Sequence, residues 1–274
     1  MTESPGASKR PQRWFEIRRP ISRRRIWILG VAIWVIFFTI WQLAVLSGLV
    51  TELLVPTPEK VLITLYELFF ERGFISDVGI SVLRVVGSFL AACAIAIPLG
   101  ILMGSFRTVE AFINPFVSAW RYLPAPAFIP VLLMWFGTGE GPKLALLFIG
   151  VVFFLITLIM DYTRQVRIEL IETAMTLGAN RSQILQIVTI PAVLPNILIA
   201  MRQMLAVSWT YLVIAEIIAS TTGIGAMMMR ARRFLHTDEI MAGIVVIGIL
   251  GLMFDLLFRW LHRLLFPYLD PESH

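Results

Sequence analysis

The sequence predicts an all-α integral membrane protein with six transmembrane helices. Of its 274 residues, 58% are hydrophobic and 15% are charged, and the mean hydropathy is +0.83. Soluble domains carry about 45 to 50% apolar and about 25% charged residues. Several apolar runs also reach the roughly 20 residues needed to cross a ~30 Å hydrocarbon core. The net charge is +5, and the charged residues are gathered in short segments between these runs. This distribution is explained better by the orientation of the chain in a membrane than by nucleic-acid binding.

The chain begins with a polar, basic tail over residues 1–25, which we expect in the cytoplasm. The tail contains eight Lys or Arg residues. Residues 26–51 form the first apolar run, which is too long for a signal peptide and lacks a small-residue cleavage site. We therefore predict a first spanning helix there, within a six-helix domain over 26–267. A short cytoplasmic tail, 268–274, follows.

The next two predicted elements are a surface helix and the second span. Pro58 stands near the first position of the surface helix, where proline is favoured because its missing N–H has no helical partner there. The second span is predicted over 85–106 and ends at Arg107. It contains Gly100 and Gly104, a spacing that lets two membrane helices approach closely.

The third apolar stretch, 111–137, is interrupted by Arg121 and by three prolines, among them Pro124 and Pro126. Proline breaks the helical hydrogen-bond ladder, and a membrane tolerates this where protein or a water-filled cavity satisfies the freed carbonyls. We therefore expect this stretch to line a cavity or path. A fourth span follows over 144–160.

The longest polar interruption after the first span, 161–181, must lie outside the bilayer. It opens a loop that extends to about residue 192, after which the fifth and sixth spans are predicted over 192–219 and 240–265. Counted over the two sides of this arrangement, 14 Lys and Arg residues face one side and 7 the other. The 7 include Arg84, in the loop before the second span, and Arg230, which begins the polar connection to the sixth span. The positive-inside rule places both termini and the loop in the cytoplasm.

The sequence offers no catalytic or metal-binding pattern. The glycine-rich loop over 137–143 ends in Lys143, but Leu144 stands where a phosphate-binding loop needs Ser or Thr. The three histidines lack metal-ligand spacing, and the single cysteine, Cys93, lies in an apolar run. We expect neither enzyme activity, nor a metal, nor a cofactor bound by this chain.

A more informative pattern lies in the long loop, where Glu172 begins the sequence ETAMTLG, which ends at Gly178. Val188, Ile190 and Pro191 follow. An amphipathic helix stopped by glycine and followed by proline would make a rigid projection that fits a socket on a partner. An ordinary loop helix with a glycine C-cap has the same local pattern.

This segment resembles the EAA motif of binding-protein-dependent ABC transporter permeases, roughly E-A-A-x3-G-x9-I-x-L-P. Thr173 replaces the first alanine and Ala174 matches the second. Similarity to the nitrate, sulfonate and taurine branch extends over about 56–267, including the sequences around Tyr122, Trp135 and Glu216. The basic tail lies outside the match.

The resemblance implies a type I ABC importer permease (MetI-like) fold in the bacterial inner membrane. The partners it implies are a second permease copy, two cytoplasmic ATPases that bind ATP and Mg, and an extracytoplasmic solute-binding protein. The solute would be a small anion such as a sulfonate, taurine or nitrate. The residues expected to couple to the ATPase are Glu172, Thr173, Ala174, Gly178 and Pro191.

Charged side chains inside a membrane are costly, so each is a candidate for function. Arg202 and Glu216 are 14 residues apart, about 21 Å along a helix, and cannot pair there. Arg202 is predicted to face the helix bundle, near a polar and aromatic band that includes Trp209. The alternative is a structural Arg202 whose charge is satisfied by backbone carbonyls or paired with a carboxylate. The predicted translocation path comprises Arg121, Pro124, Pro126, Arg202, Trp209 and Glu216.

Three arginines on the predicted outer side, Arg230, Arg232 and Arg233, depart from the positive-inside rule. They could dock a solute-binding protein or steer an anion, and a solvated loop is equally compatible. Asp255 and Arg259, four residues apart, are expected to form a salt bridge on one helix face.

An alternative function is a secondary transporter or channel driven by an ion gradient, with Arg202, Glu216 and Asp255 as a charge relay. ATP dependence separates this alternative from the importer. A membrane-embedded enzyme is disfavoured because the sequence lacks a combination of nucleophile, base and metal ligands.

Overall fold

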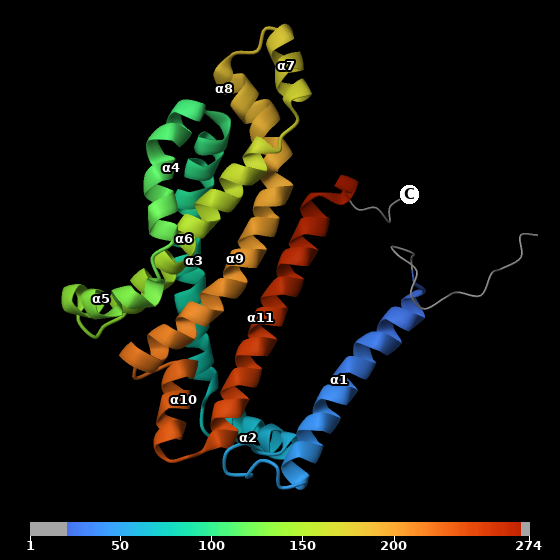
Figure 1. The fold of residues 1–274 in the computed structure, drawn as a ribbon, viewed down its shortest axis with the longest axis vertical. Coiled ribbons are helices and arrows are strands. Elements are labelled where there is room, and N and C mark those ends of the chain that lie inside the picture. Colours follow the sequence, from blue (N-terminus) through green and yellow to red (C-terminus); the bar gives the residue numbers. More distant parts are fainter. Residues whose placement is uncertain (1–20, 270–274) are drawn as a thin grey trace, which may run out of the picture. The chain divides into compact units, whose positions relative to one another are not determined.

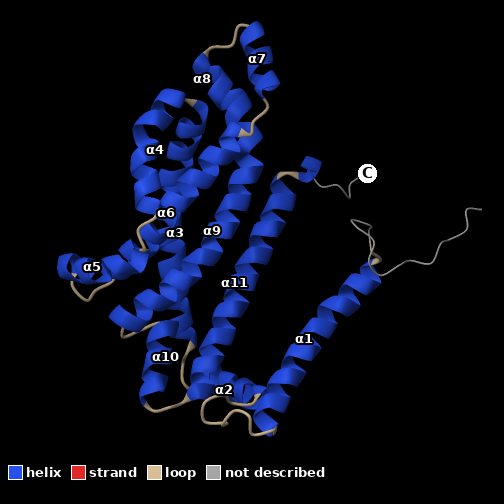
Figure 2. Ribbon diagram, viewed as in Figure 1, coloured by secondary structure: helices blue, strands red, loops and turns tan. Residues whose placement is uncertain are grey.

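The computed structural model describes residues 21–269, which form helices joined by short loops (Figures 1 and 2). Residues 21–269 contain no strand. The chain divides into two compact units, residues 1–51 and residues 52–274. The predicted all-α class is confirmed, whereas residues 1–20 of the basic tail and 270–274 of the C-terminal tail lie outside the described residues.

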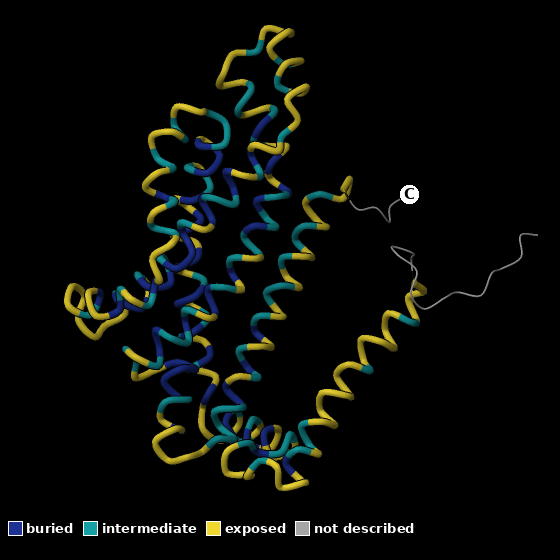
Figure 3. Tube along the Cα trace, viewed as in Figure 1, coloured by how far each residue is buried: buried dark blue, intermediate teal, exposed yellow. Residues whose placement is uncertain are grey.

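The first unit contains α1 (Arg23–Leu46), which corresponds to the predicted first span. At about 1.5 Å per residue, its 24 residues reach about 36 Å, enough to cross a bilayer. Its apolar side chains, such as Trp34 and Phe38, are exposed nearly all round the helix (Figure 3). A helix that is apolar on every face is typical of a membrane span.

The second unit contains the remaining helices. They are α2 (Pro58–Phe70), α3 (Ile75–Ser105), α4 (Arg107–Arg121), η1 (Ala125–Phe128), α5 (Ile129–Phe136), α6 (Gly141–Arg164), α7 (Ile168–Thr176), α8 (Arg181–Gln183), the π-helical η2 (Ile184–Thr189), α9 (Ile190–Ala219), α10 (Ile224–Arg233), α11 (Thr237–Leu265) and η3 (Pro267–Leu269).

Within the described residues, five helical stretches are long and apolar enough to cross a membrane: α1, α3, α6, the stretch from α8 to α9, and α11. A sixth span results if α4 is combined with the η1–α5 stretch, which is bent from it by 83°. This pair corresponds to the predicted proline-broken third span, because the break falls at Pro124. The predicted count of six spans agrees with this reading.

Two predicted boundaries need correction. The second span starts at Ile75, ten residues before its predicted start at 85, and Arg84 lies inside α3 rather than in an outer loop. Asp77, Ser81 and Arg84 in this first part of α3 bond partners on other helices and on the loops beside them. The stretch after residue 223, predicted as a simple connection with Arg230 at its start, contains the helix α10.

Helices α3 and α6 pack together along their lengths and form the centre of the second unit (Figure 1). A Cβ added to Gly100 would lie 2.7 Å from Cβ of Ile159, and one added to Gly104 would overlap the Thr163 side chain. The two glycines therefore allow the close helix approach that their spacing predicts.

Candidate functional site

The predicted coupling segment forms α7 and the turn that follows it. Helix α7 contains no buried residue, and Figure 3 shows it largely exposed beyond the packed helices. Glu172 and Thr173 are exposed, and Ala174 is half-buried. The segment therefore presents a free helical surface, and its own internal contacts do little to hold it in place.

The end of α7 is set by Gly178, whose φ of +85° lies in the left-handed region that favours glycine. Its N–H donates to the Met175 carbonyl at 2.9 Å, and Ala179 N–H donates to the Ala174 carbonyl at 2.9 Å. Asn180 then caps α8 reciprocally with Gln183. The predicted glycine stop is confirmed, and the chain turns sharply between two capped helices.

Pro191 lies at the start of α9 and is exposed. Proline has no N–H to donate to the carbonyl four residues earlier. The π-helical segment η2 immediately precedes this interruption, with Val188 inside it. The EAA-like spacing thus coincides with a change of helical geometry where the loop enters the span.

Residues predicted for the translocation path fall into separate parts of the second unit. Arg121 ends α4 with its guanidinium 5.5 Å from the centre of the Tyr122 ring. Pro124 is exposed and Pro126 is half-buried at the break before α5. The break therefore places a cation and two prolines, one of them exposed, at one bend of the chain.

On α9, Arg202 is 32% exposed and its Nε lies 3.4 Å from Oδ1 of Asp255 on α11. Asp255 also accepts a 2.7 Å hydrogen bond from Arg259, as the i,i+4 spacing predicts. Trp209 is buried beside Phe254, and its indole N–H has no hydrogen-bond partner among the described residues. The structural alternative for Arg202, a carboxylate partner, is present.

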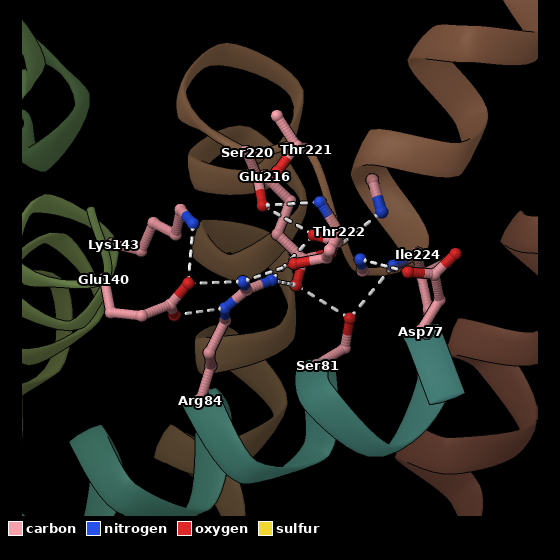
Figure 4. Close-up of polar contacts among 12 residues, drawn as sticks. Asp77, Ser81, Arg84, Glu140, Lys143, Glu216, Ser220, Thr221, Thr222 and Ile224 are labelled. Atoms are coloured by element: carbon pink, nitrogen blue, oxygen red, sulfur yellow. Dashed lines mark hydrogen bonds and ion pairs between the residues drawn. The ribbon is translucent and has the colours of Figure 1, made fainter. Parts of the chain in front are cut away.

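Glu216 belongs to a buried polar network at the far end of α9 (Figure 4). It is fully buried, and its Oε1 accepts hydrogen bonds of 2.7 Å from both Ser81 and Arg84. Its Oε2 accepts a 2.8 Å bond from Gly225 N–H. The carboxylate ties α9 to α3 and α10, and these contacts account for its charge. Its predicted position in the solute path stays a prediction.

Arg84 is 3% exposed and bonds a second carboxylate. Its Nε and Nη2 donate to the two oxygens of Glu140 at 2.6 and 2.7 Å, a bidentate geometry (Figure 4). Lys143, also buried, donates to Glu140 at 2.8 Å. The hydrogen bonds from Arg84 and then Lys143 lower the pKa of Glu140 to about 2, although burial opposes this shift.

The same network extends to the outer edge of α10. Asp77 accepts a 2.6 Å bond from Gly223 N–H and pairs with Arg230 at 3.0 Å. Gly223 has φ of +105°, and a Cβ there would overlap the Glu216 carboxylate. Of the three predicted docking arginines, Arg230 is thus tied to α3. Arg232 and Arg233 are exposed at the end of α10.

Sequence reasoning missed most of this network. The sequence indicates Glu216 as an intramembrane charge, but hydropathy places its partner Arg84 in a loop before the second span. One signal was available: Asp77, Ser81 and Arg84 are spaced i, i+4 and i+7, which places them on one helical face. Their partners are 56 to 153 positions away, so helical spacing could suggest the face but not the contacts.

Residues 96–270 match the family model of the binding-protein-dependent transport system inner membrane component. Taurine transport system permease protein TauC of Escherichia coli is 34% identical over 256 residues, covering 92% of each chain. SsuC of Bacillus subtilis, which is assigned to aliphatic sulfonates transport, is 31% identical and covers 92% of this chain and 91% of its own. The predicted family resemblance is confirmed.

The fold is similar to that of solved ABC transporters. A chain of the MetNI methionine ABC transporter, crystallised in an inward-facing conformation, superposes with a TM-score of 0.60 at 20% identity. The match covers 69% of this chain and 94% of that one. At this identity the similarity supports the fold, which agrees with the predicted MetI-like arrangement.

Proposed function

The chain belongs to the family of binding-protein-dependent transport system inner membrane components, and we propose that it carries a small sulfonate-like anion as half of a homodimeric permease. As a member of this family it is a transport subunit of an ABC importer and a multi-pass membrane protein. This membership replaces the alternative of a carrier driven by an ion gradient. The proposal concerns its solute, its partners and the residues that serve them.

The observation that carries the coupling proposal is the exposed α7 with its fixed turn. Glu172, Thr173 and Ala174 lie on a helix that buries none of its residues, and Gly178 sets the exit angle. Such a surface can bind a socket on a cytoplasmic ATPase, and Pro191 would begin the span that transmits its movement. ATP and Mg would bind in two such ATPase subunits, not in this chain.

We assign the solute path to the bend of the third span and to the central part of α9. Arg121, Pro124 and Pro126 supply a cation and irregular backbone, which lipid-exposed segments avoid. Arg202 supplies a second cation. Trp209 supplies a buried indole N–H without a partner in residues 21–269, which an anionic group could accept from. The contacts of Glu216 favour a structural role over a place in this path.

The proposed solute follows from the relatives and these cations. TauC is a taurine permease and SsuC is assigned to aliphatic sulfonates, so a sulfonate is the chemistry common to both names. A guanidinium pairs well with an oxyanion. We therefore place taurine or an alkanesulfonate ahead of nitrate as the solute.

The place where the solute-binding protein would dock follows from the orientation of the chain in the membrane. Moving Arg84 into a buried helix lowers the outer count of Lys and Arg from 7 to 6 against 14, which strengthens the bias toward cytoplasmic termini. In a bacterial inner membrane, α10 would then face outward. Arg232 and Arg233, exposed there with Arg230, would meet the solute-binding protein.

The deciding experiment measures ATP-dependent taurine and ethanesulfonate uptake by proteoliposomes that contain the permease, its ATPases and its binding protein. Gly178→Pro should reduce uptake at least about tenfold, because proline cannot adopt a φ of +85° and cannot donate the bond to Met175. Glu172→Lys should also uncouple uptake by reversing a charge on the docking surface.

Glu71→Lys is the matched control, since it makes the same charge change on an exposed residue at the end of α2. It should leave uptake within about twofold of the unmodified protein. Membrane insertion should be unchanged in all variants. Full transport by both loop variants would refute the coupling assignment, and transport without ATP would refute the importer.

A further inference from the structure

A groove between α9 and the last turns of α11 shares Arg202 with the proposed solute path, and its other lining residues have no role in that path. Its cavity volume is about 310 Å³. Arg202, Arg259, His262 and Arg263 supply its polar lining, and apolar side chains such as Phe258 supply the rest. The groove thus combines several cations with apolar walls, which suits an amphiphilic anion better than a fully hydrated one.

The positive charge of this groove exceeds what its own carboxylate can neutralise. Asp255 lies 3.4 Å from Arg202 and 2.7 Å from Arg259, so one carboxylate serves two guanidiniums. Arg263 is exposed and has no ion pair within residues 21–269. His262 Nε2 is buried and has no hydrogen-bond partner in the same described range. The groove therefore retains the unpaired guanidinium of Arg263, beside a buried imidazole nitrogen without a partner.

The location of the groove indicates where that anion would come from. Helix α11 has 29 residues, about 43 Å, so its last turns reach the membrane boundary. In Figure 1 this end of α11 lies toward the same side of the unit as α7, the side predicted to be cytoplasmic. Trp260 and Leu264 are exposed on the same turns. Aromatic side chains favour the headgroup level of a bilayer.

We propose that this groove binds the phosphate of an anionic phospholipid headgroup from the cytoplasmic leaflet. Arg259 and Arg263 bind the phosphate oxygens, and His262 provides a further polar contact. Phe258 and the neighbouring apolar walls cover the glycerol region, while acyl chains lie on the exposed apolar face of α11. Basic pockets between spans on the cytoplasmic side suit such headgroups.

The size of the groove favours a lipid headgroup over free phosphate as its ligand. Sites for molecules of drug size measure about 300 to 1,000 Å³ and are mostly apolar. At about 310 Å³ the groove exceeds what a single tetrahedral oxyanion needs, and its apolar walls would go unused by inorganic phosphate. A solute sulfonate shares the oxyanion chemistry, so the test must distinguish these sources.

The test is native mass spectrometry of the full-length chain, purified in mild detergent and titrated with dioleoyl phosphatidylglycerol or dioleoyl phosphatidylcholine. The unmodified chain should retain phosphatidylglycerol at about tenfold lower concentration than phosphatidylcholine. Arg263→Gln should weaken that retention about fivefold, and Arg259→Gln with Arg263→Gln about 25-fold, since each arginine near an anionic surface contributes about that factor.

The matched control is Arg24→Gln, which removes one exposed positive charge at the start of α1, on the same predicted side of the membrane. It should change retention less than twofold. Arg263→Gln removes no described ion pair, so its helical content by circular dichroism should be unchanged. Taurine and inorganic phosphate at millimolar concentration should fail to displace the lipid.

Three results would overturn the proposal. Equal retention of the two lipids would remove headgroup selectivity, and an equal loss in Arg24→Gln would indicate diffuse attraction by the whole basic surface. Displacement by taurine would assign the groove to the solute. The readout is lipid retention and not uptake. The lipid proposal can therefore fail while the coupling variants behave as expected, and the coupling proposal can fail while lipid retention behaves as expected.

Discussion

Where α3, α9 and α10 meet, Arg84 and Glu216 are 3% and 0% exposed and every bond they make is internal to the second unit. At the loop beyond α6, α7 buries none of its residues and ends in a turn held by local backbone bonds. The first region gains its stability from contacts within one chain. The second leaves its surface free, which is what docking to another subunit requires.

A charge in a spanning segment therefore need not mark the part of the molecule that moves or binds solute. The costly buried charges of α3 and α9 are paired with each other, and they hold three helices together. The part proposed to transmit movement contains ordinary exposed side chains. Variants at the two regions should therefore separate stability from coupling.

The largest effect on stability is expected from Glu216→Ala. Removing one member of a buried ion pair leaves Arg84 without its inner partner and typically costs about 3 to 5 kcal/mol. The midpoint of thermal unfolding in detergent should fall accordingly. Arg84→Met combined with Glu216→Met should lose less than the two single changes added together. A midpoint unchanged in Glu216→Ala would contradict the network.

A smaller loss is expected from Gly104→Ala at the contact between α3 and α6. The new Cβ would overlap Thr163, and such overpacking costs about 1 to 3 kcal/mol. Gly87→Ala on the same helix is the control, because a Cβ there meets nothing within 4 Å. Its better helix propensity should leave stability unchanged or slightly raised. Equal behaviour of the two variants would refute the close approach.

A third effect depends on pH. Hydrogen bonds from Arg84 and Lys143 lower the pKa of Glu140 from 4.5 to about 2, so its stabilisation is complete above about pH 4.5 and is lost as pH falls toward 2. Because its side chain is 54% exposed, solvent screening keeps the effect modest.

The measurement compares thermal unfolding midpoints of the unmodified chain and Glu140→Gln between pH 7 and pH 2. The difference between the two proteins should be constant down to about pH 4.5 and should shrink below it. A difference that does not change with pH would indicate that the Glu140 carboxylate does not engage Arg84 as a charged group.

The spans and the glycine stop of α7 are predictable from the sequence because both depend on local signals. Apolar run length sets a span, and glycine in a left-handed conformation stops α7 at Gly178. Arg84 was misplaced for a physical reason: a charge inside a helix becomes tolerable only through partners that hydropathy cannot reveal. Helix α10 is not predicted by hydropathy, because the arginines in its last turn resemble a polar connection between spans.

The smallest effect on stability is expected where the functional effect should be large. Gly178→Ala places a Cβ in the left-handed region, a local strain of about 1 to 2 kcal/mol. Since α7 buries no residue, this strain should tilt or fray the helix locally and leave the global unfolding midpoint within about 1 °C. Uptake per ATP hydrolysed should nevertheless fall severalfold, because a displaced helix transmits less movement. A lower unfolding midpoint in Gly178→Ala with intact uptake would contradict the coupling role proposed for α7 and would indicate a structural role instead.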